Sequence, residues 1–198
     1  MKFRMPSFGV SDNMNDIEII QELIHPKAII QPTQGKYPEQ FKAKLSEAKK
    51  PDSFIIIAGL PENSIIFHVD DCFPEPNKIF AGTRGECCRS DYIIVVEENN
   101  ALKIVLIELK GQGDDSAHIK NQLRGSQSFF EYCKAILHIF WQYKITSNCI
   151  YHYVSCKRTS EKRPTKYDPK VPANTSVETM LTLKGNGTFR FNQLIAKK

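Results

Sequence analysis

The chain has 198 residues, which is enough for one domain whose core folds unaided, and its net charge is +5. Its composition, 41% hydrophobic and 25% charged, is ordinary for a globular protein. No stretch approaches the roughly 20 apolar residues of a membrane span, and the N-terminal residues lack the apolar core of a secretory signal. We therefore expect a cytoplasmic protein without membrane contact.

The first part of the chain predicts two helices. Asn15 or Asp16 is a suitable N-cap for the first helix, which should end before a proline ten residues further on. A second short helix is expected after Pro38, because Phe41 and Leu45 would lie on one side of it.

The middle of the chain predicts strands. Two short apolar runs, 54–58 and 64–69, are joined by the turn-like sequence GLPEN and indicate a strand pair. The runs DYIIVVE at 91–97 and LKIVLIELK at 102–110 flank an Asn-Asn turn at 99–100. Both faces of these two strands are largely apolar, so this hairpin is expected in the middle of a sheet that is covered on both sides.

A long helix and further strands follow. An Asp-Asp-Ser sequence at 114–116 is expected to cap a helix whose apolar residues recur at steps of three and four. The weak position in that apolar stripe is Ser126, with a glycine beside it. A strand is expected at 149–156, and a C-terminal hairpin at 181–194 with its turn in the sequence GNG.

The order of these elements predicts a mixed α/β fold in which one central sheet is flanked by helices. We find no internal repeat and no linker, so residues 1–198 are expected to form a single domain. Its core is expected at about 15–158, and a basic segment and the C-terminal hairpin are expected to make up 159–198.

The register of the central hairpin brings three reactive side chains together. If Asn99 and Asn100 form a two-residue loop, cross-strand pairs sum to 199 and Asp91 lies opposite Glu108. Opposite residues of an antiparallel pair have Cβ atoms about 4.5–5.5 Å apart and project from the same face. Lys110 is two residues further on and projects from that face as well. A three-residue loop with a bulge would break this arrangement.

Two facing carboxylates at the end of a buried sheet repel each other and lose hydration. A hard divalent cation removes this cost, because Mg²⁺ takes one or two carboxylates and completes its octahedron with water and substrate phosphate. A neighbouring lysine can orient the attacking water and stabilise developing negative charge. The group therefore predicts hydrolysis of phosphodiester bonds with Mg²⁺ or Mn²⁺.

The sequences SDYIIV at 90–95 and LIELKG at 106–111 resemble motifs II and III of the PD-(D/E)XK nuclease superfamily, which includes restriction, repair and phage-defence enzymes. The resemblance covers about residues 84–156 and implies a restriction endonuclease-like core with the element order αβββαβ. One departure is Ser90, which stands where the name-giving proline would be.

The resemblance also implies roles for individual residues. The implied metal ligands are the side chains of Asp91 and Glu108 and the backbone carbonyl of Leu109. Lys110 corresponds to the catalytic lysine of the family. A glutamine near the start of the long helix would contact the attacking water or the phosphate; Gln122 fits best and Gln127 is second.

The expected substrate is nucleic acid, with DNA favoured over RNA. A segment rich in Lys and Arg, residues 157–170, is expected to bind the phosphate backbone. Its candidate contacts are Lys157, Arg158, Lys162 and Arg163. By resemblance, such compact nucleases act in defence or restriction, as homodimers or beside an activating protein partner.

Several alternatives stay open at this stage. Asp91 and Glu108 at a solvated sheet edge, paired with Lys110 and Arg89, would carry no function. The fold could also serve as a catalytically inactive module that binds nucleic acid or a protein partner. Glu22 on the first helix is a further candidate for the site, although surface exposure is favoured. A zinc site is conceivable at three cysteines, which are Cys72, Cys87 and Cys88.

Overall fold

The computed structural model describes residues 14–35, 40–47, 50–69, 80–110, 115–157, 173–185 and 187–195. Its helices are α1 (Asp16–Leu23), α2 (Ser116–Phe140) and α3 (Phe191–Leu194). Its strands are β1 (Thr33–Gln34), β2 (Phe41–Glu47), β3 (Lys50–Leu60), β4 (Ile65–His68), β5 (Tyr92–Glu98), β6 (Ala101–Lys110), β7 (Asn148–Lys157), β8 (Leu181–Lys184) and β9 (Thr188–Arg190).

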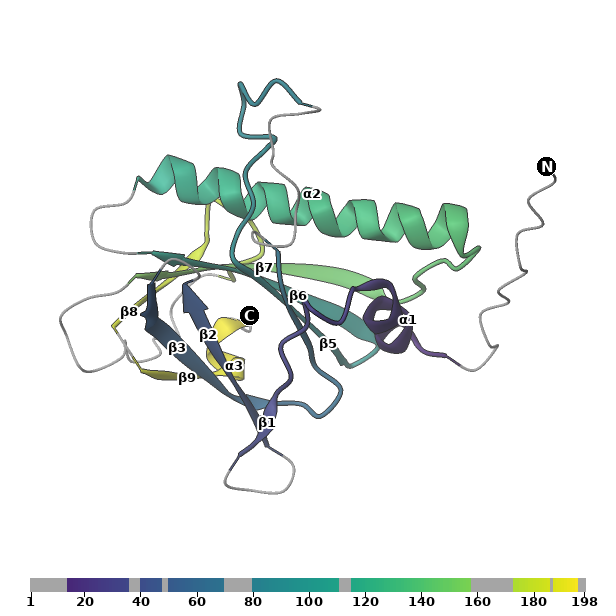
Figure 1. Cartoon of the computed structure of the whole chain (residues 1–198), viewed down its shortest axis with the longest axis horizontal. Helices are drawn as coiled ribbons and strands as arrows, with labels where there is room; N and C mark the ends of the chain where they lie inside the picture. The colour runs from purple at the N-terminus through teal and green to yellow at the C-terminus, as the bar shows by residue number, and fades with distance from the viewer. Residues whose placement is uncertain are drawn as a thin grey trace.

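The strands form two mixed sheets, which confirms an α/β fold. One sheet has the order β4-β5-β6-β7-β8 and the other the order β1-β2-β3-β9. In the five-stranded sheet β4, β5 and β6 are antiparallel neighbours, whereas β6, β7 and β8 run parallel. Figure 1 shows α2 lying along one face of this sheet, with β2, β3 and β9 on the opposite side.

Each face of the five-stranded sheet has its own apolar core. Residues of β5 and β6 alternate between the two, so that Ile93 packs towards α1 and α2 while Ile94 packs towards the four-stranded sheet. This alternation explains why both faces of the hairpin are apolar. The sequence predicts helices on both faces of the central sheet. In the structure, however, the second sheet covers one of these faces.

The central hairpin has the expected register. Glu98 pairs with Ala101 and Tyr92 with Ile107, so every pair sums to 199. Asn99 and Asn100 have φ angles of 55° and 58°, as a tight two-residue turn requires. Asparagine tolerates this left-handed conformation better than most residues, so the turn sequence itself fixes the register.

The long helix is also confirmed. Asp115 is the N-cap of α2, and its side chain accepts a hydrogen bond from the backbone N–H of Ala117 at 2.9 Å. The face of α2 towards the sheet is apolar apart from Ser126, which is fully buried. Within the described ranges, no helix is long and apolar enough to cross a membrane.

The first helix is anchored by a buried carboxylate. Asn15 is its N-cap and forms a reciprocal capping box with Glu18. Asp16 is buried and accepts hydrogen bonds from the Tyr143 hydroxyl at 2.7 Å and the Ser147 N–H at 2.8 Å. Burial works to raise the pKa of Asp16, but these hydrogen bonds outweigh it and the pKa is lowered. The carboxylate thus ties α1 to the segment between α2 and β7.

The second helix predicted after Pro38 is wrong, because residues 41–47 form strand β2. The alternation of Phe41, Ala43 and Leu45 with two lysines has a period of two. Ala43 and Leu45 are buried, and the two lysines are exposed. A strand exposes every second residue, whereas a helix would leave these side chains on different sides.

Two predicted strand pairs are wrong as well. Strands β3 and β4 lie in different sheets, since β3 pairs with β2 and β9 while β4 pairs with β5. The predicted C-terminal hairpin at 181–194 does not form either: β8 runs parallel to β7, β9 runs parallel to β3, and residues 191–194 form α3. Both short connections lead from one sheet to the other.

Candidate functional site

The predicted carboxylates meet where β5 begins and β6 ends. Extending the hairpin register by one pair places Asp91 opposite Glu108. The Asp91 N–H donates to Glu108 Oε2 at 3.2 Å, and the Leu109 N–H donates to Asp91 Oδ2 at 2.7 Å. Each carboxylate, together termed the carboxylate pair below, therefore accepts a hydrogen bond from the backbone of the opposite strand. Both belong to the sheet face that packs against α2, where Ile93 and Leu106 form the next pair.

Glu108 is an ionisable group in an almost closed environment. Its residue is 1% exposed, and its Oε1 lies 2.9 Å from the Nζ of Lys110. Burial and the negative charge of Asp91 raise the pKa of Glu108 to about 8, although Lys110 acts in the opposite direction. The alternative in which Glu108 lies at a solvated sheet edge is therefore wrong, because this side chain is buried. The ionised form of Glu108 depends on a positive partner, and Lys110 is such a partner.

Further polar atoms are buried in elements next to the carboxylate pair. Ser155 on β7 is in register with Glu108 on β6, so its side chain projects from the same face. Ser155 Oγ and Gln122 Oε1 are among the few buried side-chain atoms of the described residues that have no hydrogen-bond partner, and His152 Nε2 is another. Buried polar atoms normally have a partner, so these two oxygen atoms are the kind that a bound ion, water or ligand satisfies.

The start of β5 is held against α2 by a direct backbone approach. Both the N–H and the O–H of Ser90 donate to Ser126 Oγ, each at 2.7 Å. A Cβ added to Gly125 would lie 1.8 Å from the carbonyl oxygen of Cys88. Gly125 and Ser126, which interrupt the apolar stripe of α2, are therefore the residues through which α2 contacts the segment that leads into Asp91.

The donor set suits a hard divalent cation better than zinc. No three His, Cys, Asp or Glu side chains form a metal-binding group within the described parts of the chain. The carboxylate pair could supply two oxygen ligands, and the buried oxygens of Gln122 and Ser155 lie on the adjoining elements α2 and β7. Mg²⁺ commonly binds through one or two carboxylates and keeps several waters, so these residues fit it.

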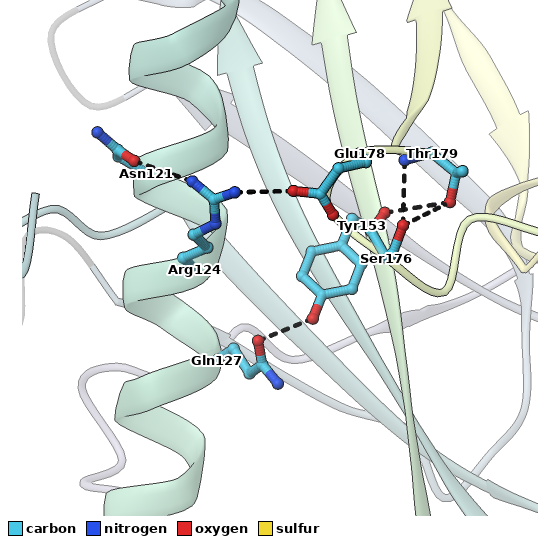
Figure 2. A network of polar contacts seen from close by, with 7 residues as sticks. All are labelled: Asn121, Arg124, Gln127, Tyr153, Ser176, Glu178 and Thr179. Atoms are coloured by element: carbon cyan, nitrogen blue, oxygen red, sulfur yellow. Dashed lines mark hydrogen bonds and ion pairs between the residues drawn. The ribbon is translucent and has the colours of Figure 1, made fainter.

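Gln127, the second glutamine candidate, is engaged elsewhere. Its Oε1 accepts a hydrogen bond from the Tyr153 hydroxyl at 2.8 Å. Figure 2 shows this contact beside Arg124, whose guanidinium lies 2.8 Å from a carboxylate oxygen of Glu178. These contacts tie α2 to β7 and to the segment before β8. Gln122 lies one turn earlier in α2, on the side of Ser126, and is half-buried.

The structure describes only some of the remaining residues that the sequence predicts for the site. Glu22 is exposed on α1, as the helical pattern favours. Lys157 is the last residue of β7 and is in register with Lys110. Three of the residues predicted to contact the phosphate backbone of nucleic acid lie outside the described residues, namely Arg158, Lys162 and Arg163. Of the proposed zinc cysteines, Cys72 also lies outside them, and Cys87 and Cys88 are half-buried thiols.

Two features of this region were not expected from the sequence. Ser155 lies between the buried apolar residues Val154 and Cys156 of β7, and a small polar residue at that place is the signal that indicates it. The role of Ser126 as an acceptor for Ser90 was hidden, because the partner lies 36 residues away. No family model, curated protein or solved structure matches this chain.

Proposed function

We propose that the protein is a metal-dependent nuclease that hydrolyses phosphodiester bonds of nucleic acid, with DNA as its substrate. The observation that carries the proposal is the meeting of Asp91 and Glu108 on one sheet face, with Lys110 bonded to the buried Glu108. A purely structural protein gains little from such a group, since burying the Glu108 carboxylate opposite the half-buried Asp91 is costly.

Each residue has a role in the proposed reaction. Asp91 and Glu108 would hold Mg²⁺ or Mn²⁺, and the Leu109 carbonyl is the third proposed ligand. A bound divalent cation would supply Lewis-acid polarisation of the phosphate and lower the pKa of water. Lys110 would orient the attacking water and stabilise negative charge that develops on the phosphate. Gln122, with its buried unpartnered oxygen, would contact the water or the phosphate.

The fold is compatible with the proposed family. With β1, β2 and β3 set aside, which lie between α1 and β4 in the chain, the order α1, β4, β5, β6, α2, β7 is αβββαβ, and β6 and β7 are parallel. We propose on this basis that these elements form a restriction endonuclease-like core. The four-stranded sheet and β8 would be additions to that core.

A nuclease assay tests the proposal. Supercoiled plasmid, single-stranded DNA and RNA are each incubated with the protein in Mg²⁺, in Mn²⁺ and in EDTA. We expect cleavage of DNA with either metal and none in EDTA. Lys110→Met should reduce the cleavage rate by about 10²- to 10³-fold, the usual range for loss of one group that stabilises developing negative charge.

The matched control for that assay is Lys103→Met. Lys103 lies on the same strand, but at its other end, where it pairs with Glu98. Its replacement should leave the cleavage rate within about twofold of the wild type. Tight, salt-sensitive binding without cleavage under any metal would contradict the nuclease and support a non-catalytic module that binds nucleic acid.

A further inference from the structure

Three lysines stand in one row across the parallel half of the five-stranded sheet. Lys110 on β6 is in register with Lys157 on β7, and Lys157 is in register with Lys184 on β8. Neighbouring residues in register project from the same face of a sheet, so all three side chains belong to the face that carries Glu108. They are termed the lysine row below.

The lysine row begins at the carboxylate pair and leads outwards. The Lys110 side chain is 16% exposed and bonds to Glu108, Lys157 is half-buried, and Lys184 is exposed. Strand β8 is the last strand of its sheet among the described residues. The positive charge thus extends from a buried site to the last strand of the described sheet.

The dimensions of the row suit a nucleic-acid strand. Adjacent strands lie about 4.8 Å apart, so the row spans roughly 10 Å between its outer Cα atoms. One strand of a duplex carries a phosphate about every 3.4 Å along its axis, so this span covers about three phosphates. Lysine binds phosphate as a flexible point charge, which tolerates imperfect spacing.

Resting on the proposed nuclease function, we propose that the lysine row is the track of the cleaved strand. Its reacting phosphate lies at the carboxylate pair, and the phosphates next to it pass over Lys157 and Lys184 towards the edge of β8. The sequence alone marked Lys157 as a backbone contact; Lys184 is a new member of the binding surface. The contacts are made to phosphates, so the row binds without regard to base sequence.

Salt-dependent binding tests the track without any need for cleavage. A labelled duplex and a labelled single strand of equal length are titrated by fluorescence anisotropy in EDTA at several salt concentrations. For Lys184→Met, the slope of log K against log[salt] should become shallower by about 0.9 on the duplex or 0.7 on the single strand. Lys184→Arg keeps the charge and should keep the slope.

The control is Lys134→Met, which removes the same charge from α2, where Lys134 pairs with Glu131. It should leave the slope unchanged. Equal slopes for Lys184→Met and Lys134→Met would overturn the track, even if the wild type cleaves DNA in Mg²⁺. A shallower slope for Lys184→Met alone would support binding of a nucleic-acid strand along the lysine row. If no metal gives cleavage, that result would overturn the nuclease and leave the row as a binding surface without cleavage.

Discussion

Glu108→Gln is expected to lower the rate of DNA cleavage in Mg²⁺ by roughly a thousandfold or more. Glutamine has nearly the same shape but no negative charge, so the variant loses one of two carboxylates that would hold the cation. Loss of several kcal/mol of transition-state stabilisation corresponds to such a factor. Initial rates of plasmid cleavage at saturating metal give the measurement. The matched control is Glu98→Gln at the far end of the same hairpin, which should cleave normally.

The same substitution is expected to stabilise the metal-free protein at alkaline pH. The pKa of Glu108 is raised from 4.5 to about 8, so between these values the folded protein binds more protons than the unfolded chain. The contribution of Glu108 to stability is fully present below about pH 4.5 and is lost as the pH rises through about 8.

Relative to Glu108→Gln, the wild type should therefore lose on the order of a few kcal/mol of unfolding free energy over this pH range. Urea unfolding of both proteins in EDTA at pH 5, 7 and 9 measures the difference. Parallel stability curves for the two proteins would show that Glu108 titrates as it does in the unfolded chain, and that its burial carries no electrostatic cost.

Gly125→Ala is expected to destabilise the fold by about 3 kcal/mol or more. Alanine is ordinarily the better helix former, which alone would favour the variant by about 1 kcal/mol. Its Cβ would however lie 1.8 Å from the carbonyl oxygen of Cys88, and that atom belongs to the backbone. The helix must then move away from residues 88–90, which overpacking in a close-packed interior makes costly.

The control for Gly125→Ala is Ser128→Ala on the exposed side of α2. The Ser128 hydroxyl donates only to the carbonyl of Arg124, within the helix, so its replacement should change the free energy of unfolding by about 0.5 kcal/mol or less. Chemical unfolding of both variants gives the comparison. A Gly125→Ala protein as stable as the wild type would mean that α2 does not approach the start of β5 this closely.

Local sequence signals account for what could be predicted of the site. The turn at Asn99 and Asn100 fixes the register of β5 and β6, and register is a local property of a two-residue loop. The cap at Asp115 and the periodic apolar stripe likewise define α2. Because Asp91, Glu108 and Lys110 all lie on this one hairpin, their juxtaposition could be worked out without knowledge of the remaining fold.

The errors concern pairings between distant segments. Strands β8 and β9 are only a few residues apart, yet each pairs with a strand from earlier in the chain. A glycine-rich connection between two apolar runs has the same local sequence whether it closes a hairpin or leads into another sheet. Strand β2 is a different case, because the sequence itself contains the period-two alternation of Phe41, Ala43 and Leu45, which is typical of a strand and not of the predicted helix.

The lysine row could not be predicted from the sequence either, because it depends on pairings between distant strands. Lys110, Lys157 and Lys184 are separated by 47 and 27 residues, and only the parallel pairing of β6, β7 and β8 aligns them. The buried Ser155 joins Glu108 by the same pairing. Long-range registers of this kind decide which polar residues surround the carboxylate pair, and no periodicity within one segment contains them.

Binding of Mn²⁺, measured by the electron paramagnetic resonance signal of the free ion, addresses the carboxylate pair without reference to any substrate. Titrations at pH 8 would compare the wild type with Glu108→Gln and with the surface control Glu98→Gln. We expect the wild type and the control to bind Mn²⁺ with equal affinity, and Glu108→Gln to bind it at least about tenfold more weakly, a difference of about 1.4 kcal/mol. Equal affinity in all three proteins, or no binding by the wild type, would contradict a shared cation between Asp91 and Glu108.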